Sequence, residues 1–184
     1  MVTDFSFVGL IKGTWNQVST AFWQKYPNPY STNVLTEDVI FREVTPDNRL
    51  LSRRLLTKTG PVPRWAESFF TSFTAYYVIE DSVVDPVNKT MVTFTRNISH
   101  THFISVKEQC VYRVNPEDSN WTEINKKAWI SSSMFGLSKP VKELGLARVK
   151  DTVPNTMKGF EYILAKMMDE EKAKDMASQA QKKQ

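Results

Sequence analysis

The sequence predicts an α+β fold in which a curved antiparallel sheet of about seven strands wraps around a long C-terminal helix. Strand-like runs joined by turns of hairpin length occupy most of the chain before residue 132, which favours antiparallel pairing. A helical apolar pattern then extends from Ser138 to Met168. Because an antiparallel sheet with one solvated face needs cover on the other, the long helix is expected to lie against the sheet.

The strands are indicated by apolar residues that lie between turn signals. Phe5 and Phe7 alternate with polar neighbours, which is typical of a short first strand. Thr14 and Gln17 have the spacing of a capping box, so a short helix is expected to begin there. The strands expected after it span 34–44, 50–58, 75–84, 91–99, 103–114 and 121–131.

The C-terminal helix is expected to begin at Ser138, because Pro140 is tolerated in a first helical turn. A second proline, Pro154, removes one backbone hydrogen bond and is expected to kink the helix. Pro154 lies where one apolar stripe gives way to a second, rotated from the first by roughly a third of a turn or more. The stripes are Leu137, Val141 and Leu144, and then Val153, Met157, Phe160, Leu164 and Met167.

The first stripe continues into Arg148, Thr152 and Asn155, and this change of polarity has two interpretations. In one, the helix leaves its core and turns these side chains to water, as is usual for arginine. In the other, the side chains face an interior that is polar at one end. Such an interior would suit a ligand with an apolar body and an anionic head.

The segment 60–73 interrupts the strand pattern with a proline-bounded, aromatic-rich insertion. One interpretation is a short connecting helix that buries Trp65 and Phe69 in the core. The other is a lid whose aromatic residues cover a ligand opening or touch a bilayer interface, where Trp is favoured. The residues assigned to the lid or membrane contact are Pro63, Trp65, Phe69 and Phe70.

Length and composition limit the classes of function. The chain of 184 residues is long enough for one domain with a sizeable core, which we place at residues 1–168, with 169–184 as a fraying, solvated polar tail. Its net charge of +4 is compatible with an anionic membrane surface or nucleic acid. Because the basic residues do not concentrate on one element, no nucleic-acid partner is expected. The single cysteine, Cys110, excludes an internal disulfide framework.

Signatures of targeting, catalysis and metal binding are not found in the sequence. The N-terminus resembles neither a secretory signal nor a transit peptide, and no apolar run approaches the ~18 residues of a membrane span. There is no nucleophile elbow or phosphate-binding glycine loop. His100 and His102 have no carboxylate at ligand spacing and are expected at the surface or core edge. We therefore expect no enzyme activity, metal or cofactor, although a Ser-His-Asp triad is assembled in space rather than in sequence.

Several motifs, in register from the N-terminus to about Met167, resemble the signature of the PRELI/MSF1 family. Segments 50–59 and 113–115 are similar to one branch of that family. The motifs are Lys25-Tyr26-Pro27-Asn28-Pro29-Tyr30-Ser31, Arg53-Arg54-Leu55-Leu56, Pro63-Arg64-Trp65, Asp81-Ser82-Val83-Val84-Asp85-Pro86 and Met157-Lys158-Gly159-Phe160-Glu161.

The resemblance implies a START- or phosphatidylinositol-transfer-like fold with a lid loop. It implies a lipid carrier of the mitochondrial intermembrane space that moves phosphatidic acid from the outer to the inner membrane and so supplies cardiolipin synthesis. It also implies a heterodimer with a small twin Cys-x9-Cys helical hairpin protein, and peripheral contact with an anionic, cardiolipin-rich membrane. The alternatives are phosphatidylserine transfer, a lipid-modifying hydrolase, and a regulatory binding protein that carries no lipid.

By position, the resemblance places the phosphate at Lys58, where the family has a lysine. Lys25 and Arg148 stand where other members have Arg and Lys, so the charge is kept. The lipid headgroup is thereby assigned to Lys25, Asn33, Lys58, Arg148, Thr152 and Asn155.

Overall fold

The computed structural model describes residues 2–69 and 75–182. Within these residues the helices are α1 (Trp15–Trp23), the 3-10 helix η1 (Arg64–Phe69) and α2 (Ser138–Gln181). The strands are β1 (Thr3–Ile11), β2 (Val34–Val44), β3 (Leu50–Lys58), β4 (Tyr76–Asp85), β5 (Thr90–Asn97), β6 (Ser105–Val114) and β7 (Thr122–Ser131).

All neighbouring strands pair antiparallel, in the order β1-β7-β6-β5-β4-β3-β2. From β2 to β7 the sheet is a meander, and β1 extends it as an edge strand by pairing with β7. The prediction of a seven-stranded antiparallel sheet with a long C-terminal helix is confirmed. The bounds of β2 and β3 coincide with the predicted runs 34–44 and 50–58, because turn residues delimit these runs sharply.

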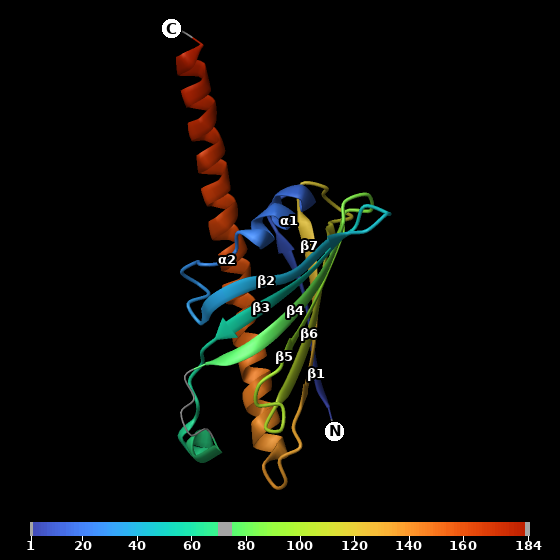
Figure 1. The fold of residues 1–184 in the computed structure, drawn as a ribbon, viewed down its shortest axis with the longest axis vertical. Helices are drawn as coiled ribbons and strands as arrows, with labels where there is room; N and C mark the ends of the chain where they lie inside the picture. Colours follow the sequence, from blue (N-terminus) through green and yellow to red (C-terminus); the bar gives the residue numbers. More distant parts are fainter. Residues whose placement is uncertain (1, 70–74, 183–184) are drawn as a thin grey trace.

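The sheet curves around α2, which runs along its inner face (Figure 1). The alternation along β7 shows which face is inner, since Ile124, Ala128 and Ile130 are buried while Lys127 and Trp129 between them are exposed. Ala128 and Ile130 share a core cluster with Val149 of α2. One face of the sheet is therefore covered by the helix and the other faces solvent.

The short helix α1 closes the upper end of the fold as drawn in Figure 1. Its capping box is formed as predicted: the Thr14 hydroxyl accepts from the Gln17 amide at 3.3 Å, and the Gln17 side chain accepts from the Thr14 amide at 3.0 Å. Its buried residues pack against α2 in the main core. That cluster contains Ile11, Trp15, Val18, Ala21, Phe22, Val84, Met91, Tyr112, Ile124, Phe160, Ile163 and Leu164.

The long helix α2 begins at Ser138 as predicted and runs uninterrupted through Pro154. Gly145 lets it approach the sheet closely, because a Cβ there would lie 2.6 Å from Ile104 Cδ1 and 2.8 Å from Ile130 Cγ2. The second predicted stripe supplies Phe160 and Leu164 to the core, and Ile163, which was not in that stripe, joins them. No helix within residues 2–69 and 75–182 is long and apolar enough to cross a membrane.

Residues 169–181 were expected to fray, but they continue the helix to Gln181. They are exposed along their whole length and project beyond the sheet (Figure 1). The polar, solvated character of this segment agrees with its composition, whereas its conformation is helical. The boundary of the domain at residue 168 stays a prediction.

Candidate functional site: a cavity between the sheet and the long helix

A cavity of about 490 Å³ lies between the inner face of the sheet and α2. This volume is within the range of ligand pockets in proteins. The apolar part of its wall includes Phe7, Phe22, Leu56, Val78, Val106, Tyr112, Ile124, Val149 and Met157. The polar part includes all six predicted headgroup residues, namely Lys25, Asn33, Lys58, Arg148, Thr152 and Asn155.

Lys25 lies deep in the cavity, with only 8% of its surface exposed. It comes just after Gln24, the residue that caps the end of α1, and the next turn is stabilised by Asn28, whose side chain donates to the Lys25 carbonyl at 2.7 Å. The Lys25 ammonium lies 5.2 Å from the ring centres of Tyr26 and of Phe160, a favourable cation–π arrangement. Burial lowers the pKa of Lys25, and the Glu80 carboxylate opposes that shift only in part.

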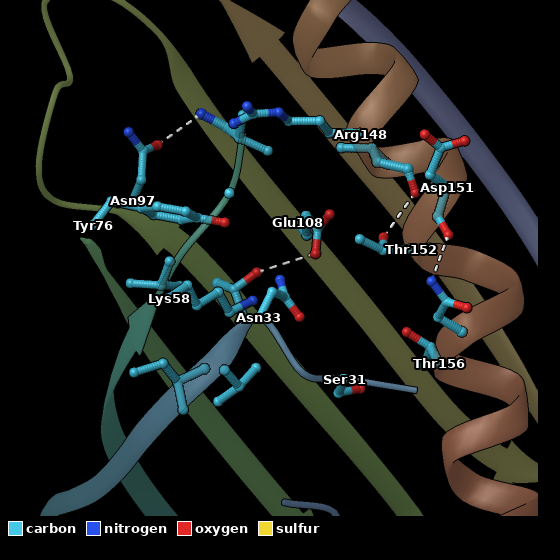
Figure 2. A pocket seen from close by; sticks show the side chains of 18 of the residues that line it. Ser31, Asn33, Lys58, Tyr76, Asn97, Glu108, Arg148, Asp151, Thr152 and Thr156 are labelled. Atoms are coloured by element: carbon cyan, nitrogen blue, oxygen red, sulfur yellow. Dashed lines mark hydrogen bonds between the residues drawn. The ribbon is translucent and has the colours of Figure 1, made fainter. Parts of the chain in front are cut away.

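Lys58 is the last residue of β3, where the sheet register places it between Val34 and Tyr76. The Thr59 amide donates to the Asn33 carbonyl at 2.8 Å, so Asn33 is held beside the end of β3. Figure 2 shows Lys58 and Asn33 close together on the strand side of the cavity, facing α2. Neither Lys25 nor Lys58 has a carboxylate ion-pair partner among residues 2–69 and 75–182.

Arg148 reaches from α2 across the cavity toward the strand side (Figure 2). Its Nη2 donates to the carbonyl oxygen of Pro61, and its Nη1 lies within 3.5 Å of the position a Cβ on Gly60 would take. The guanidinium therefore joins α2 to the chain that follows Lys58.

Thr152 and Asn155 lie on α2 at the exposed side of the cavity. The Thr152 hydroxyl donates to the Val149 carbonyl at 2.8 Å, and the Asn155 amide donates to the Asp151 carbonyl at 3.4 Å. Both interpretations of the polar stripe are thus partly correct. The stripe borders the cavity from Arg148 onward, and its last two members also face water.

Two buried or partly buried acid–base clusters in the cavity region were missed by sequence reasoning. In the first, the buried Arg54 guanidinium donates from Nε to Glu80 at 2.7 Å and from Nη1 to Glu37 at 2.8 Å. It also lies 4.6 Å from the ring centre of Phe22. Burial raises the pKa of Glu37, although Arg54 acts against this shift. The alternation of β3 was the available signal, because Arg54 is two and four residues from Leu56 and Lys58 and so shares their face.

In the second cluster, the Lys126 ammonium of β7 lies 3.0 Å from the Glu108 carboxylate of β6. The Thr95 hydroxyl also donates to Glu108, at 3.4 Å. Lys126 and Glu108 are cross-strand diagonal neighbours rather than sequence neighbours, so only the register brings them together. Glu80 and Glu108 both line the cavity, but each is paired with a cation.

The segment that follows β3 lies beside the cavity. Pro63 lines it, together with Gly60, Pro61 and Val62. The expected short helix exists as η1, but the expectation that it buries Trp65 is wrong, because Trp65 is 44% exposed and Ala66 is the buried residue. The helix is rotated so that the small side chain of Ala66, rather than the indole, points inward. The side chain of Phe69 and the whole of Phe70 lie outside the described residues, so their place in a lid stays a prediction.

The remaining candidates occupy ordinary positions. His102 is exposed, whereas His100 is half-buried at the cavity wall. Cys110 is half-buried on the wall, and burial raises the pKa of its thiol. Within residues 2–69 and 75–182, no three His, Cys, Asp or Glu side chains gather as metal ligands would.

An open antiparallel sheet curved around a long helix, with a cavity between them, defines a START-like fold. The structure is similar to that of a START superfamily protein from Mycobacterium smegmatis, with a TM-score of 0.57 and 12% identity, over 87% of this chain and 98% of that one. It is also similar to the protein TTHA0849 from Thermus thermophilus, with a TM-score of 0.62 and 12% identity, over 90% and 99% of the two chains. At such low identity these likenesses show the fold alone.

The chain belongs to the PRELI-like family, whose sequence pattern matches residues 16–171. It is 57% identical over 182 residues to human "PRELI domain-containing protein 1, mitochondrial", covering 98% of this chain and 83% of the human protein. The corresponding Gallus gallus protein is 58% identical over 175 residues, covering 94% and 81% of the two chains. "Protein UPS1, mitochondrial" of Saccharomyces cerevisiae is 34% identical over 150 residues, covering 82% and 86%.

Proposed function

We propose that this protein is a non-catalytic lipid carrier that binds phosphatidic acid in the cavity between the sheet and α2. The observation that carries the proposal is the charge distribution in the cavity. Of its three carboxylates, Glu80 and Glu108 are paired with Arg54 and Lys126, and Asp151 lies on the exposed side of α2. Lys25 and Lys58 have no carboxylate ion-pair partner in the described part of the chain. The cavity therefore offers surplus positive charge next to an apolar wall.

The apolar wall supports a role in carrying acyl chains. Moving two acyl chains of about sixteen carbons each from a bilayer into water costs on the order of 20 kcal/mol, at ~0.8 kcal/mol for each CH₂. A carrier must replace the bilayer for such a ligand. Aromatic and aliphatic side chains from β1, β4, β6, β7 and α2 supply that environment.

The free cations support a phosphate monoester as the headgroup. Such a group carries between one and a half and about two negative charges near neutral pH, and a lysine in a cavity of low polarity attracts it more strongly than a solvated one does. Lys58 and Lys25 would contact the phosphate. Arg148, Asn33, Thr152 and Asn155 would surround the headgroup at the exposed side.

We place the carrier in mitochondria because the relatives named above are mitochondrial. The proposal includes movement of phosphatidic acid across the intermembrane space, from the outer to the inner membrane, for cardiolipin synthesis. It also includes a heterodimer with a small twin Cys-x9-Cys helical hairpin protein. The net charge of +4 favours approach to an anionic, cardiolipin-rich leaflet.

Residues 60–73 would act as the lid in this function. Pro63 borders the cavity and Trp65 is exposed beside it, which suits a segment that covers the ligand and touches the bilayer interface. Phe69 and Phe70 are assigned to the same lid from the sequence.

Native mass spectrometry of the protein purified with its hairpin partner tests the proposal. A one-to-one adduct, identified as phosphatidic acid after lipid extraction, is the expected result. An empty protein that still binds its partner would overturn the carrier function and favour a regulatory role. A new product released from bound lipid would indicate a hydrolase.

Phosphatidylserine is a second candidate ligand, and Glu108 is the observation that favours it. This carboxylate lines the cavity and, in Figure 2, lies between Lys58 and Thr152, where it could accept a hydrogen bond from a serine ammonium. Competition between phosphatidic acid and phosphatidylserine vesicles for loading separates the two. We expect phosphatidic acid to win, because Lys126 already neutralises Glu108.

A further inference from the structure

Three loops meet at the lower end of the molecule as drawn in Figure 1. They are η1, the β5–β6 connection at 98–104, and the β7–α2 connection at 132–137. A small apolar cluster joins them: Ala66, Phe103 and Val141 are buried together. Val62, Ile104, Met134 and Leu137 pack around these three. The three loops therefore form one packed unit rather than separate mobile tips.

Each of these loops presents an apolar side chain to solvent. Trp65 of η1 is 44% exposed, Ile98 of the β5–β6 connection is 45% exposed, and Phe135 of the β7–α2 connection is fully exposed at 102%. Phe135 precedes Gly136, whose φ of +74° turns the loop and whose surroundings are open within 4 Å. Because the Phe135 side chain packs against no other part of the protein, its exposure to water is unfavourable and is not offset within the fold.

Exposed cations flank the same three loops. Arg64 lies in η1 beside Trp65. Lys139 follows the β7–α2 connection that contains Phe135, which we call the Phe135 loop. Arg96 of β5 and Lys107 of β6 pair in register near the ends of these strands, next to the 98–104 connection. None of these four has an ion-pair partner within residues 2–69 and 75–182. Glu67 and Glu143 are the exposed acidic residues of η1 and the first turns of α2, so positive charge prevails at this end.

The cavity reaches this end of the molecule as well. Val62, Ser99, His100 and Phe103 belong to the joined loops or their borders and also line the cavity. A surface that rests on these loops would therefore lie beside the ligand. Separate aromatic and aliphatic tips with a cationic surround match the interfacial zone of an anionic bilayer better than a protein groove, which requires one continuous apolar patch.

We propose that the Phe135 loop, with Trp65 and Ile98, is a docking surface for anionic lipid bilayers, and that Phe135 is its principal inserting residue. This inference rests on the proposed lipid-carrier function and adds to it a membrane contact outside the 60–73 segment. Phe135 enters the interface between headgroups and acyl chains. Arg64, Arg96, Lys107 and Lys139 attract the anionic headgroups around it.

Vesicle flotation with the full chain tests this surface. The probes are vesicles of phosphatidylcholine mixed with phosphatidylglycerol, and vesicles of phosphatidylcholine alone. We expect Phe135→Asp to weaken partitioning onto the mixed vesicles about tenfold or more, the factor that burial of one phenylalanine supplies. Phe135→Trp should retain partitioning, because Trp is favoured at the interface.

The matched control is Val87→Asp. Val87 is 73% exposed in the β4–β5 turn, which lies at the opposite end of the sheet (Figure 1). This variant should partition like the unsubstituted protein. Equal partitioning of Phe135→Asp and Val87→Asp would overturn the proposal. Equal binding of the unsubstituted protein to both kinds of vesicle would overturn the role of the four cations.

Two further measurements distinguish membrane docking from an effect on lipid loading and from self-association. Native mass spectrometry should find the same lipid occupancy in Phe135→Asp as in the unsubstituted protein. If neither Phe135→Asp nor the unsubstituted protein carried lipid, the proposed carrier function would be wrong, but the difference in vesicle binding would still support the docking surface. Size-exclusion chromatography should show no change in oligomeric state, and dissociation of a dimer by Phe135→Asp would identify the loop as a contact between copies and overturn the membrane assignment.

Discussion

Arg148 of α2 donates a hydrogen bond from its Nη2 to the backbone carbonyl oxygen of Pro61. The two residues are 87 positions apart in the chain. Because Pro61 precedes η1 and Arg148 lines the cavity, this bond ties the base of the proposed lid to the helix that forms the opposite wall. A headgroup that binds Arg148 would compete with the Pro61 carbonyl for the same donor.

Arg148→Ala should loosen the segment after β3. A hydrogen bond from a half-exposed charged group contributes on the order of 1 kcal/mol, so amide hydrogen exchange at 59–66 should become several-fold faster. Lys150→Ala, at an exposed position two residues further along α2, is the control. Unchanged exchange at 59–66 in Arg148→Ala would show that other contacts hold the segment.

Lys58→Glu should abolish lipid transfer between liposomes while the fold stays intact. The substitution places a carboxylate where the phosphate is proposed to bind. Because repulsion replaces attraction, transfer should fall about tenfold or more. Lys127→Glu makes the same charge change on the outer face of β7. Transfer that is equal in the two variants would remove Lys58 from the headgroup site.

Lys25 should make stability depend on pH in a predictable direction. Burial lowers its pKa in the folded state, so its charged form costs stability at every pH below the folded pKa. That cost disappears as pH rises through the folded pKa toward the higher unfolded value. Lys25→Met should therefore increase the free energy of unfolding at neutral pH, and the free energy of unfolding of this variant should rise less than that of the unsubstituted protein when the pH is raised.

Urea unfolding at neutral and mildly alkaline pH measures this effect. The exposed Lys127→Met variant controls for loss of a lysine. Loss of stability in Lys25→Met at neutral pH would contradict the prediction. The same ammonium predicts weaker binding of phosphatidic acid as pH rises through the folded pKa of Lys25, since the neutral amine no longer attracts the phosphate.

The buried pair of Arg54 and Glu80 should be costly to break from either side. Arg54→Met leaves the Glu80 carboxylate buried and unpaired, which should destabilise the fold by about 3–5 kcal/mol. The double variant Arg54→Met/Glu80→Leu should recover part of that loss, because the Glu80 carboxylate is no longer buried without Arg54, while the half-buried Glu37 still loses its partner. Thermal unfolding of the single and double variants provides the measurement.

The neighbouring pair on the outer face is the matched control. Arg53 and Asp81 are half-exposed and lie 2.6 Å apart, so Arg53→Met should leave the melting temperature nearly unchanged. A double variant no more stable than Arg54→Met alone would indicate that Arg54 matters through its packing on Phe22 rather than through Glu80.

The α+β class, the seven strands, the capping box at Thr14 and the start of α2 could all be predicted from the sequence. These features depend on local signals: alternation, turn residues and cap chemistry act within a few positions of the chain. The resemblance to the family also assigned Lys25, Asn33, Lys58 and Arg148 to the headgroup position by position, and all four line the cavity.

Which charged side chains lack an ion-pair partner, and so can bind a ligand, depends on tertiary packing. The pairing of Glu80 with Arg54 and of Glu108 with Lys126 depends on strand register, and register is set by packing of the whole sheet on α2. The rotation of η1, which buries Ala66 and exposes Trp65, and the exposure of Phe135 were decided in the same way. The burial of a residue depends on all the side chains that pack against it, and most of these side chains come from distant parts of the chain.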